Sequence, residues 1–189
     1  MGGRRKGFHG AVVDGAGLVA GPRVLACPAD VVGWLQPFQP RVVAVDSPCA
    51  LAPDGARSRP DERRFAREVL SLRYTPDRRS LAARPRYYEW IAHGLELYAA
   101  LAHAGLRAIE CFPTACWTLW AGARHGEPRA RWSERALRAL GVAGLPARLG
   151  QDGRDAIAAA LTALDYDRGR TRNIGDIVIP AVARRGSRR

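Results

Sequence analysis

The spacing of apolar residues at the start of the chain predicts strands. Residues 8–13 are largely apolar, and the Asp14-Gly15 pair after them is typical of a hairpin turn that leads into a second strand around residues 23–26. Residues 41–46 form a nearly continuous run of β-branched and small residues, as in a strand buried on both faces. The pattern therefore predicts a hairpin, followed by a buried strand that ends in an acid.

Most of the remaining chain has apolar residues at helical spacing. The predicted helices cover residues 29–36, 60–72, 86–104, 114–121, 133–140 and 152–164, and further strands are predicted at residues 106–112 and 174–179. Residues 51–59 and 74–84 are predicted loops. Strands that alternate with helices in this way predict an α/β fold with three layers.

Length and composition indicate a globular protein. The chain has 189 residues, of which 47% are hydrophobic and 25% are charged. This is enough apolar material for a core, and it excludes a disordered chain. We predict a single domain over residues 1–182, followed by a basic flexible tail at residues 183–189.

No export signal or membrane segment is predicted. The longest apolar stretch, residues 156–164, is less than half of the roughly 20 residues that a membrane-spanning helix needs. Arg4 and Arg5 are similar to the start of a twin-arginine signal, but Asp14 interrupts the apolar region that would follow. The four cysteines lack metal-site or C-x-x-C spacing, which favours free thiols. We therefore expect a cytoplasmic protein with no membrane partner.

The charge of the chain indicates a polyanionic partner. There are 30 Lys and Arg residues against 18 Asp and Glu, which gives a formal net charge of +12. Lys6 is the single lysine, and such a bias toward arginine is also typical of a GC-rich coding sequence. Within residues 57–90, however, ten Arg face five acids. We expect Arg57, Arg59 and Arg63 in this region to bind the phosphates of DNA or RNA.

Acidic residues stand at the ends of predicted elements, which is where ligands bind in open α/β sheets. Asp46 ends the buried strand and precedes a Ser-Pro pair, and Glu110 lies near the end of the strand at residues 106–112. Asp152 and Asp155 open the Ala-rich helix three residues apart, so they share one face of that helix. The pattern therefore places four carboxylates where they can meet at one site.

Grouped carboxylates repel one another and persist most readily around a divalent cation. We therefore expect Asp46, Asp152 and Asp155 to bind Mg²⁺ or Mn²⁺, and Glu110 to assist them as a fourth catalytic residue. Two such ions would stabilise the attacking and leaving oxygens of a phosphoryl displacement.

Each of these acids also has a structural interpretation. Asp46 is suited to cap a turn, and Asp152 and Asp155 are suited to complement the dipole at the start of their helix. Glu110 can pair with any of the many arginines. Taken singly, the structural roles are favoured, and only the combination of strand-end and helix-start acids indicates a site.

The segments that carry the acids resemble the RNase H-like superfamily, and most closely a family of uncharacterised bacterial and archaeal proteins described as predicted RNase H-like nucleases. The matching segments have moderately specific motifs and span most of the chain from residue 42 onward: residues 42–48, 55–63, 108–113, 151–156 and 176–180. The resemblance implies a three-layer α/β fold, with a mixed five-stranded sheet and helices on both faces.

The resemblance also implies a metal site. In the resolvase-like branch of that superfamily, the metal-binding acids come from the first strand, the fourth strand and the last core helix. By this resemblance Asp46 is the acid of the fourth strand, and Asp152 and Asp155 are the pair on the helix.

The sequence departs from the family pattern at its start. The family opens with a strand that carries a Gly-x-Asp motif and then a Gly- and Arg-rich turn, and residues 1–9 resemble that turn. Asp14 is too close to Asp46 to be the first acid, because three strands and a helix do not fit between them. We therefore expect the first strand and its acid to be missing, and Met1 to be a start assigned within a longer reading frame.

A metal-dependent nuclease that hydrolyses phosphodiester bonds is the expected function. The alternative is a non-catalytic nucleic-acid-binding or scaffold protein that retains the RNase H-like fold. An actin-like or kinase-like phosphotransferase is a weaker alternative, because the chain has neither a second copy of the fold nor a phosphate-cradling Gly-rich loop.

Overall fold

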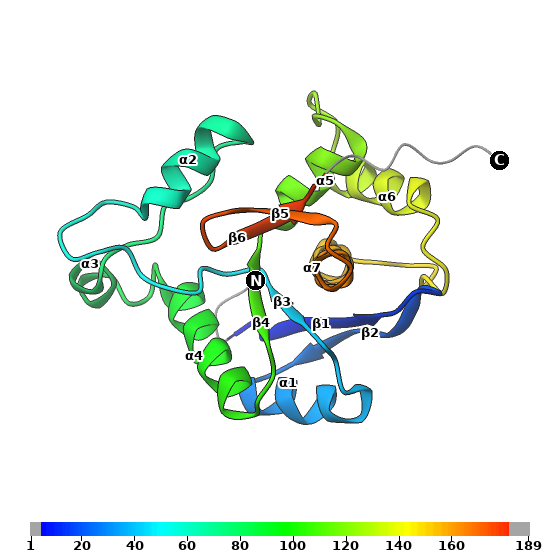
Figure 1. Cartoon of the computed structure of the whole chain (residues 1–189), viewed down its shortest axis with the longest axis horizontal. Helices are drawn as coiled ribbons and strands as arrows, with labels where there is room; N and C mark the ends of the chain where they lie inside the picture. The colour runs from blue at the N-terminus through cyan, green and yellow to red at the C-terminus, as the bar shows by residue number, and fades with distance from the viewer. Residues whose placement is uncertain (1–4, 182–189) are drawn as a thin grey trace.

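The computed structural model describes residues 5–181, which form two β-sheets and the helices around them (Figure 1). The strands are β1 (Phe8–Val13), β2 (Leu18–Leu25), β3 (Val43–Val45), β4 (Ala108–Cys111), β5 (Thr171–Ile174) and β6 (Ile177–Pro180). The helices are α1 (Pro28–Leu35), the short 3₁₀ helix η1 (Gln36–Phe38), α2 (Pro60–Glu68), α3 (Arg78–Ala83), α4 (Glu89–His103), α5 (Pro113–Ala121), α6 (Arg129–Ala139) and α7 (Gln151–Asp167). The predicted α/β class is confirmed.

The strands divide into two sheets. β1 and β2 form an antiparallel hairpin, and the second sheet has the order β3-β4-β6-β5, in which β3, β4 and β6 are parallel and β5 is antiparallel. Instead of the single five-stranded sheet expected from the sequence, residues 5–181 thus form a two-stranded and a mixed four-stranded sheet. The division arises because β1 and β3 do not pair, and no strand in the described range lies between them.

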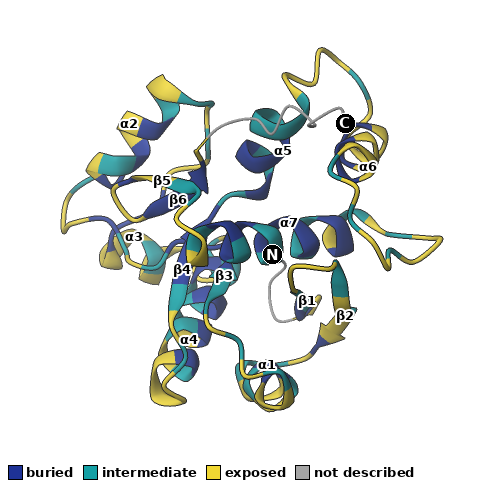
Figure 2. Cartoon of the chain, turned by 45° about the vertical axis from the view of Figure 1, so that its right-hand side comes forward, coloured by how far each residue is buried: buried dark blue, intermediate teal, exposed yellow. Residues whose placement is uncertain are grey.

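Helix α7 lies at the centre of the molecule, where it packs on the hairpin, on β3, β4 and β6, and on helices α5 and α6 (Figures 1 and 2). Its many alanines allow this close approach on several sides. Ile157 and Ala158 are fully buried and join Trp117 and Trp132 in one core cluster. The Ala-rich segment predicted as a helix therefore forms the internal support of the fold.

A second core cluster lies between the hairpin, α1, α4 and β3. It contains Phe8 from the hairpin, Val31 and Leu35 from α1, Val45 from β3 and Leu97 from α4. Helix α4 therefore covers the side of β3 and β4 that faces away from α7 (Figure 1). This arrangement places helices on both sides of the four-stranded sheet.

The predicted strand at residues 174–179 and the predicted loop at residues 74–84 are wrong in detail. The chain reverses at Gly175, whose φ of 58° suits glycine, so β5 and β6 form a hairpin instead of one strand. The predicted loop contains α3, because Asp77 accepts a hydrogen bond from the backbone N–H of Ser80 (2.8 Å) and caps a short helix there.

Two further predictions concern the ends of the chain and the membrane. The predicted tail at residues 183–189 lies outside the described residues, and the single domain over residues 1–182 stays a prediction. Across residues 5–181, every helix is too short or too polar to cross a membrane.

Candidate functional site

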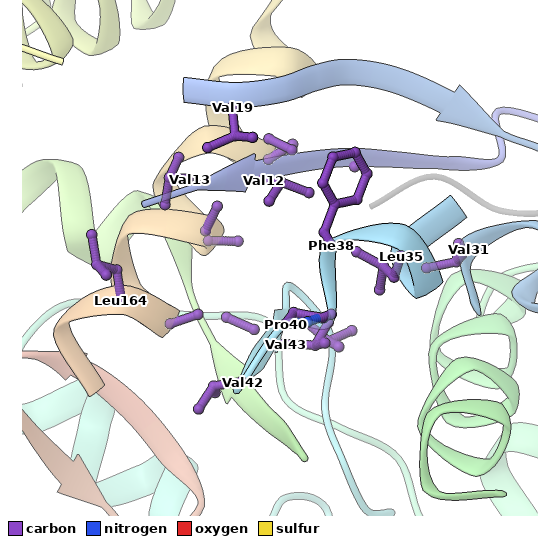
Figure 3. Close-up of a pocket in the computed structure, with 18 of the residues that line it drawn as sticks. Val12, Val13, Val19, Val31, Leu35, Phe38, Pro40, Val42, Val43 and Leu164 are labelled. Carbon is purple, nitrogen blue, oxygen red and sulfur yellow. The ribbon is translucent and has the colours of Figure 1, made fainter. Parts of the chain in front are cut away.

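A groove with a volume of about 460 Å³ separates β1 from β3 (Figure 3). The two strands form opposite walls, and α7 and the α1–η1 segment form the other two. Most of the lining is apolar, as shown by Val12, Val31, Phe38, Val43 and Leu164 in Figure 3. Acidic residues are confined to the two ends of the groove, and one of these ends holds the predicted site.

Asp46, Asp152 and Asp155 all line the groove at the end where α7 begins. Asp46 directly follows β3 and is half-buried. Burial raises the pKa of the Asp46 carboxyl group, and the negative charge of Asp155 raises it further. The structure therefore brings together the three acids predicted to bind a metal, although they come from distant parts of the chain.

Asp155 is held in place by three donors. Its Oδ1 accepts hydrogen bonds from Trp117 Nε1 (2.8 Å) and from Gln151 Nε2 (2.9 Å), and its Oδ2 pairs with Arg129 Nη2 at 2.9 Å. Trp117 is fully buried and comes from α5, whereas Arg129 opens α6 and is partly exposed. These contacts fix the direction of the carboxylate before any ligand arrives.

His9 is a site residue that the sequence analysis missed. Its Nε2 lies 3.7 Å from Oδ2 of Asp152, and both residues line the groove. His9 belongs to β1 and Asp152 to the first turn of α7, so no local spacing in the sequence connects them. The same holds for Trp117 and Arg129, whose contacts with Asp155 depend on the packing of α5 and α6.

Glu110 lies outside the groove, in a buried ion pair. Its two carboxylate oxygens accept hydrogen bonds from Nη1 and Nη2 of Arg59, at 2.7 and 2.5 Å. The backbone N–H of Cys49 donates a further bond to Glu110 (2.9 Å). The geometry thus matches the structural interpretation of Glu110, as the partner of an arginine.

Arg59 is correspondingly unsuited to bind phosphate. Only 4% of its side chain is exposed, and its guanidinium also lies 3.4 Å from Glu62. The predicted nucleic-acid contact of Arg59 is therefore corrected to a structural role. Arg57 and Arg63 are both exposed, and Arg63 donates a hydrogen bond to Ser58 (2.9 Å).

The three acids suit a divalent cation by their chemistry, since carboxylate oxygens are the ligands that Mg²⁺ and Mn²⁺ prefer. Their arrangement is less complete. Within residues 5–181, no three or more His, Cys, Asp or Glu side chains are placed so that they could hold a metal ion. Both oxygens of Asp155 already have protein donors, so cation binding requires Asp155 to exchange at least one of them.

These features define an α/β protein in which an acidic cluster closes one end of an apolar groove. A family model described as "Protein of unknown function (DUF429)" matches residues 2–178, and the chain therefore belongs to that family. A search of the curated proteins and a search of the solved structures each found no match.

Proposed function

We propose that this protein is a metal-dependent nuclease of the RNase H-like type, which hydrolyses phosphodiester bonds in DNA or RNA. The observation that carries the proposal is the convergence of Asp46, Asp152 and Asp155 at one end of the groove. This convergence joins a strand end to a helix start, as expected for a site in an α/β sheet. The resemblance of these segments to RNase H-like nucleases supports the same function.

In this proposal Asp46 and Asp152 provide the most accessible oxygens for Mg²⁺ or Mn²⁺, and Asp155 completes the set. When bound, the cation would activate a water molecule and stabilise charge on the phosphate oxygens. Asp155 is oriented by Trp117, so its position does not depend on the cation. His9 lies beside Asp152 and is placed to hold a proton during hydrolysis.

Arginines near the site would position the nucleic acid. Arg129 is partly exposed and lies next to Asp155, so it is the best-placed residue to contact a phosphate beside the acidic cluster. Arg57 and Arg63 are exposed on the segment that follows β3, where they extend the basic surface. Such contacts are independent of base sequence and weaken as salt concentration rises.

A non-catalytic nucleic-acid-binding protein is the second candidate. It is favoured by the contacts of Asp155, since Arg129 and Gln151 use the oxygens that a cation would need. In this case the same arginines bind the phosphate backbone, and the acidic cluster stabilises the start of α7.

The test is a cleavage assay on single- and double-stranded DNA and RNA, with Mg²⁺ or Mn²⁺ and with a chelator. We expect cleavage only with the cation, and its loss in Asp46→Asn. The matched control is Asp54→Asn, because Asp54 is an exposed loop residue that does not line the groove. The control should cleave like the unmodified protein.

Binding is measured in parallel, by the fluorescence anisotropy of labelled oligonucleotides over a range of salt concentrations. Salt-dependent binding without cleavage in any divalent cation would support the second candidate. Cleavage that survives Asp46→Asn contradicts the proposed site, and the absence of both cleavage and binding contradicts both functions.

A further inference from the structure

The groove is bordered by two strands that run in opposite directions along α7. β1 begins beside the start of α7, where His9 approaches Asp152, and its turn residue Gly15 lies near Arg168 just after the end of α7. β3 runs the other way, since Arg41 before it pairs with Asp167 at 3.1 Å. A segment between β1 and β3 would therefore be parallel to one strand and antiparallel to the other.

Both walls present strand edges that have no partner strand within residues 5–181. β1 pairs only with β2, and β3 is at the edge of its sheet and pairs only with β4. The N–H of Val43 donates to the carbonyl of Arg107 at 2.8 Å, on the β4 side. Because successive residues of a strand point their backbone groups to opposite edges, the N–H and C=O of Ala44 point into the groove.

The remaining two walls are apolar and come from helices. Ala156, Ala159, Ala160 and Ala163 of α7 form one of them. Val31, Trp34, Leu35 and Phe38 form the other, from α1 and η1. An occupant would therefore contact apolar side chains on two faces and backbone groups on two edges, which is the environment of a strand in the middle of a sheet.

The length of the groove also fits a strand. Lining residues on α7 extend from Asp152 to Asp167, which corresponds to roughly 22 Å along a helix that rises 1.5 Å per residue. At about 3.3 Å per residue, an extended segment of about seven residues spans this length.

The charges at the two ends add a further requirement. Five carboxylates line the groove, and all of them lie at its ends: Asp14, Asp46, Asp152, Asp155 and Asp167. They outnumber the basic lining residues, Arg41 and His9. The complementary occupant is apolar in its middle and basic at its flanks.

We propose that the groove binds an extended polypeptide segment of about seven apolar residues with basic flanks, supplied from outside residues 5–181. The segment pairs with β1 on one edge and with β3 on the other. Insertion joins the two sheets into one, in the order β2-β1-segment-β3-β4-β6-β5. This inference is independent of the proposed nuclease function, because it rests on the strand edges and on the apolar walls.

The test uses synthetic peptides that have seven inner residues chosen from Val, Ile and Ala and two lysines at each end. Binding is followed by the fluorescence of Trp34, which lines the groove, and by hydrogen exchange of the Ala44 amide. We expect saturable binding and at least about tenfold slower exchange at Ala44, as for an amide that gains a hydrogen bond. The same peptides with N-methylated backbone amides retain their side chains but should not bind.

Two protein variants locate the binding. Ala160→Phe on α7 fills the groove and should weaken peptide binding at least about tenfold, or about 1.4 kcal/mol. Ala102→Phe, on the exposed side of α4, is the matched control and should leave binding unchanged. Hydrogen exchange of the unliganded variants reports whether each is folded.

The proposal is overturned if none of the peptides binds, or if the N-methylated peptides bind equally well. It is also overturned if palmitate protects Ala44 and the peptides do not, because the groove would then be a site for an acyl chain.

Discussion

The buried pair between Arg59 and Glu110 shows how a single contact settles the role of a residue. In the sequence both side chains are plausible site residues, one as a phosphate ligand and the other as a catalytic acid. Arg59 and Glu110 are 4% and 6% exposed and meet through two hydrogen bonds, so each compensates the charge of the other. Neither is then available to a substrate.

Arg59→Met should destabilise the protein by about 3–5 kcal/mol, because it leaves the carboxylate of Glu110 buried without its partner. The free energy of unfolding in urea measures this loss. Arg64→Met is the matched control, since Arg64 pairs with Glu68 on the exposed surface and its removal should have no measurable effect. Similar stabilities for the two variants would show that the buried pair contributes little.

Cys49 gives a second prediction at the residue scale. Burial, together with the charge of Glu110, raises the pKa of the Cys49 thiol to about 12. At pH 8 the thiolate is therefore scarce, and alkylation by iodoacetamide should be about thirtyfold slower than for an ordinary cysteine, after allowance for the greater nucleophilicity of a more basic thiolate. Mass spectrometry of the Cys49 peptide, in the native protein and in urea, measures the ratio. Equal rates in the two states would contradict the prediction.

At the scale of elements, local sequence signals predicted much of the structure. The strand at residues 8–13 has the predicted bounds, and the helix beginning at Pro60 starts where proline and acids indicate. The sequence also identified the acids at the ends of β3 and at the start of α7. These signals worked because each is contained within a few neighbouring residues.

The features that were missed depend on contacts between distant segments. The run of β-branched residues at 41–46 predicted a long strand, but only Val43–Val45 pairs, because β3 follows the short β4 on one edge and faces the groove on the other. The partners of Asp155 and the pairing of Arg59 with Glu110 arise only after the helices pack. No spacing within the sequence could have revealed them.

Gly175 gives a prediction about the β5–β6 hairpin. Its φ is 58°, and a Cβ at this position would overlap the carboxylate of Asp61. Gly175→Ala should therefore cost the left-handed strain of roughly 1–2 kcal/mol and a further amount for the overlap. Gly169→Ala is the matched control, since Gly169 has a φ of 64° and no atom within 4 Å of the added Cβ.

Thermal unfolding of both glycine variants separates the two terms. The additional cost of Gly175→Ala should disappear when Asp61→Ala is combined with it. Equal stabilities for the two single variants would indicate that Asp61 moves aside without cost.

At the scale of the whole molecule, α7 connects all the parts that the strands leave separate. It contacts the hairpin on one side, the four-stranded sheet on another, and α5 and α6 on a third (Figure 2). The two sheets therefore share a core although they share no hydrogen bonds. Cooperative unfolding of the molecule should depend on this one helix.

Ile157→Ala tests this dependence. Ile157 is fully buried on α7 beside Trp117 and Trp132, so the truncation should cost about 2–5 kcal/mol. Tryptophan fluorescence and circular dichroism should report the same shifted urea transition if the molecule unfolds as a unit. Two separate transitions would show that the hairpin and the four-stranded sheet unfold independently.

The groove between β1 and β3 has a thermodynamic consequence for the stability of the chain. The groove exists only in the folded state, so anything that occupies it shifts the folding equilibrium by mass action. At an occupant concentration one hundred times its Kd, the free energy of unfolding would rise by about 2.7 kcal/mol. The melting temperature of this protein would then depend on the concentration of its occupant as well as on its own sequence.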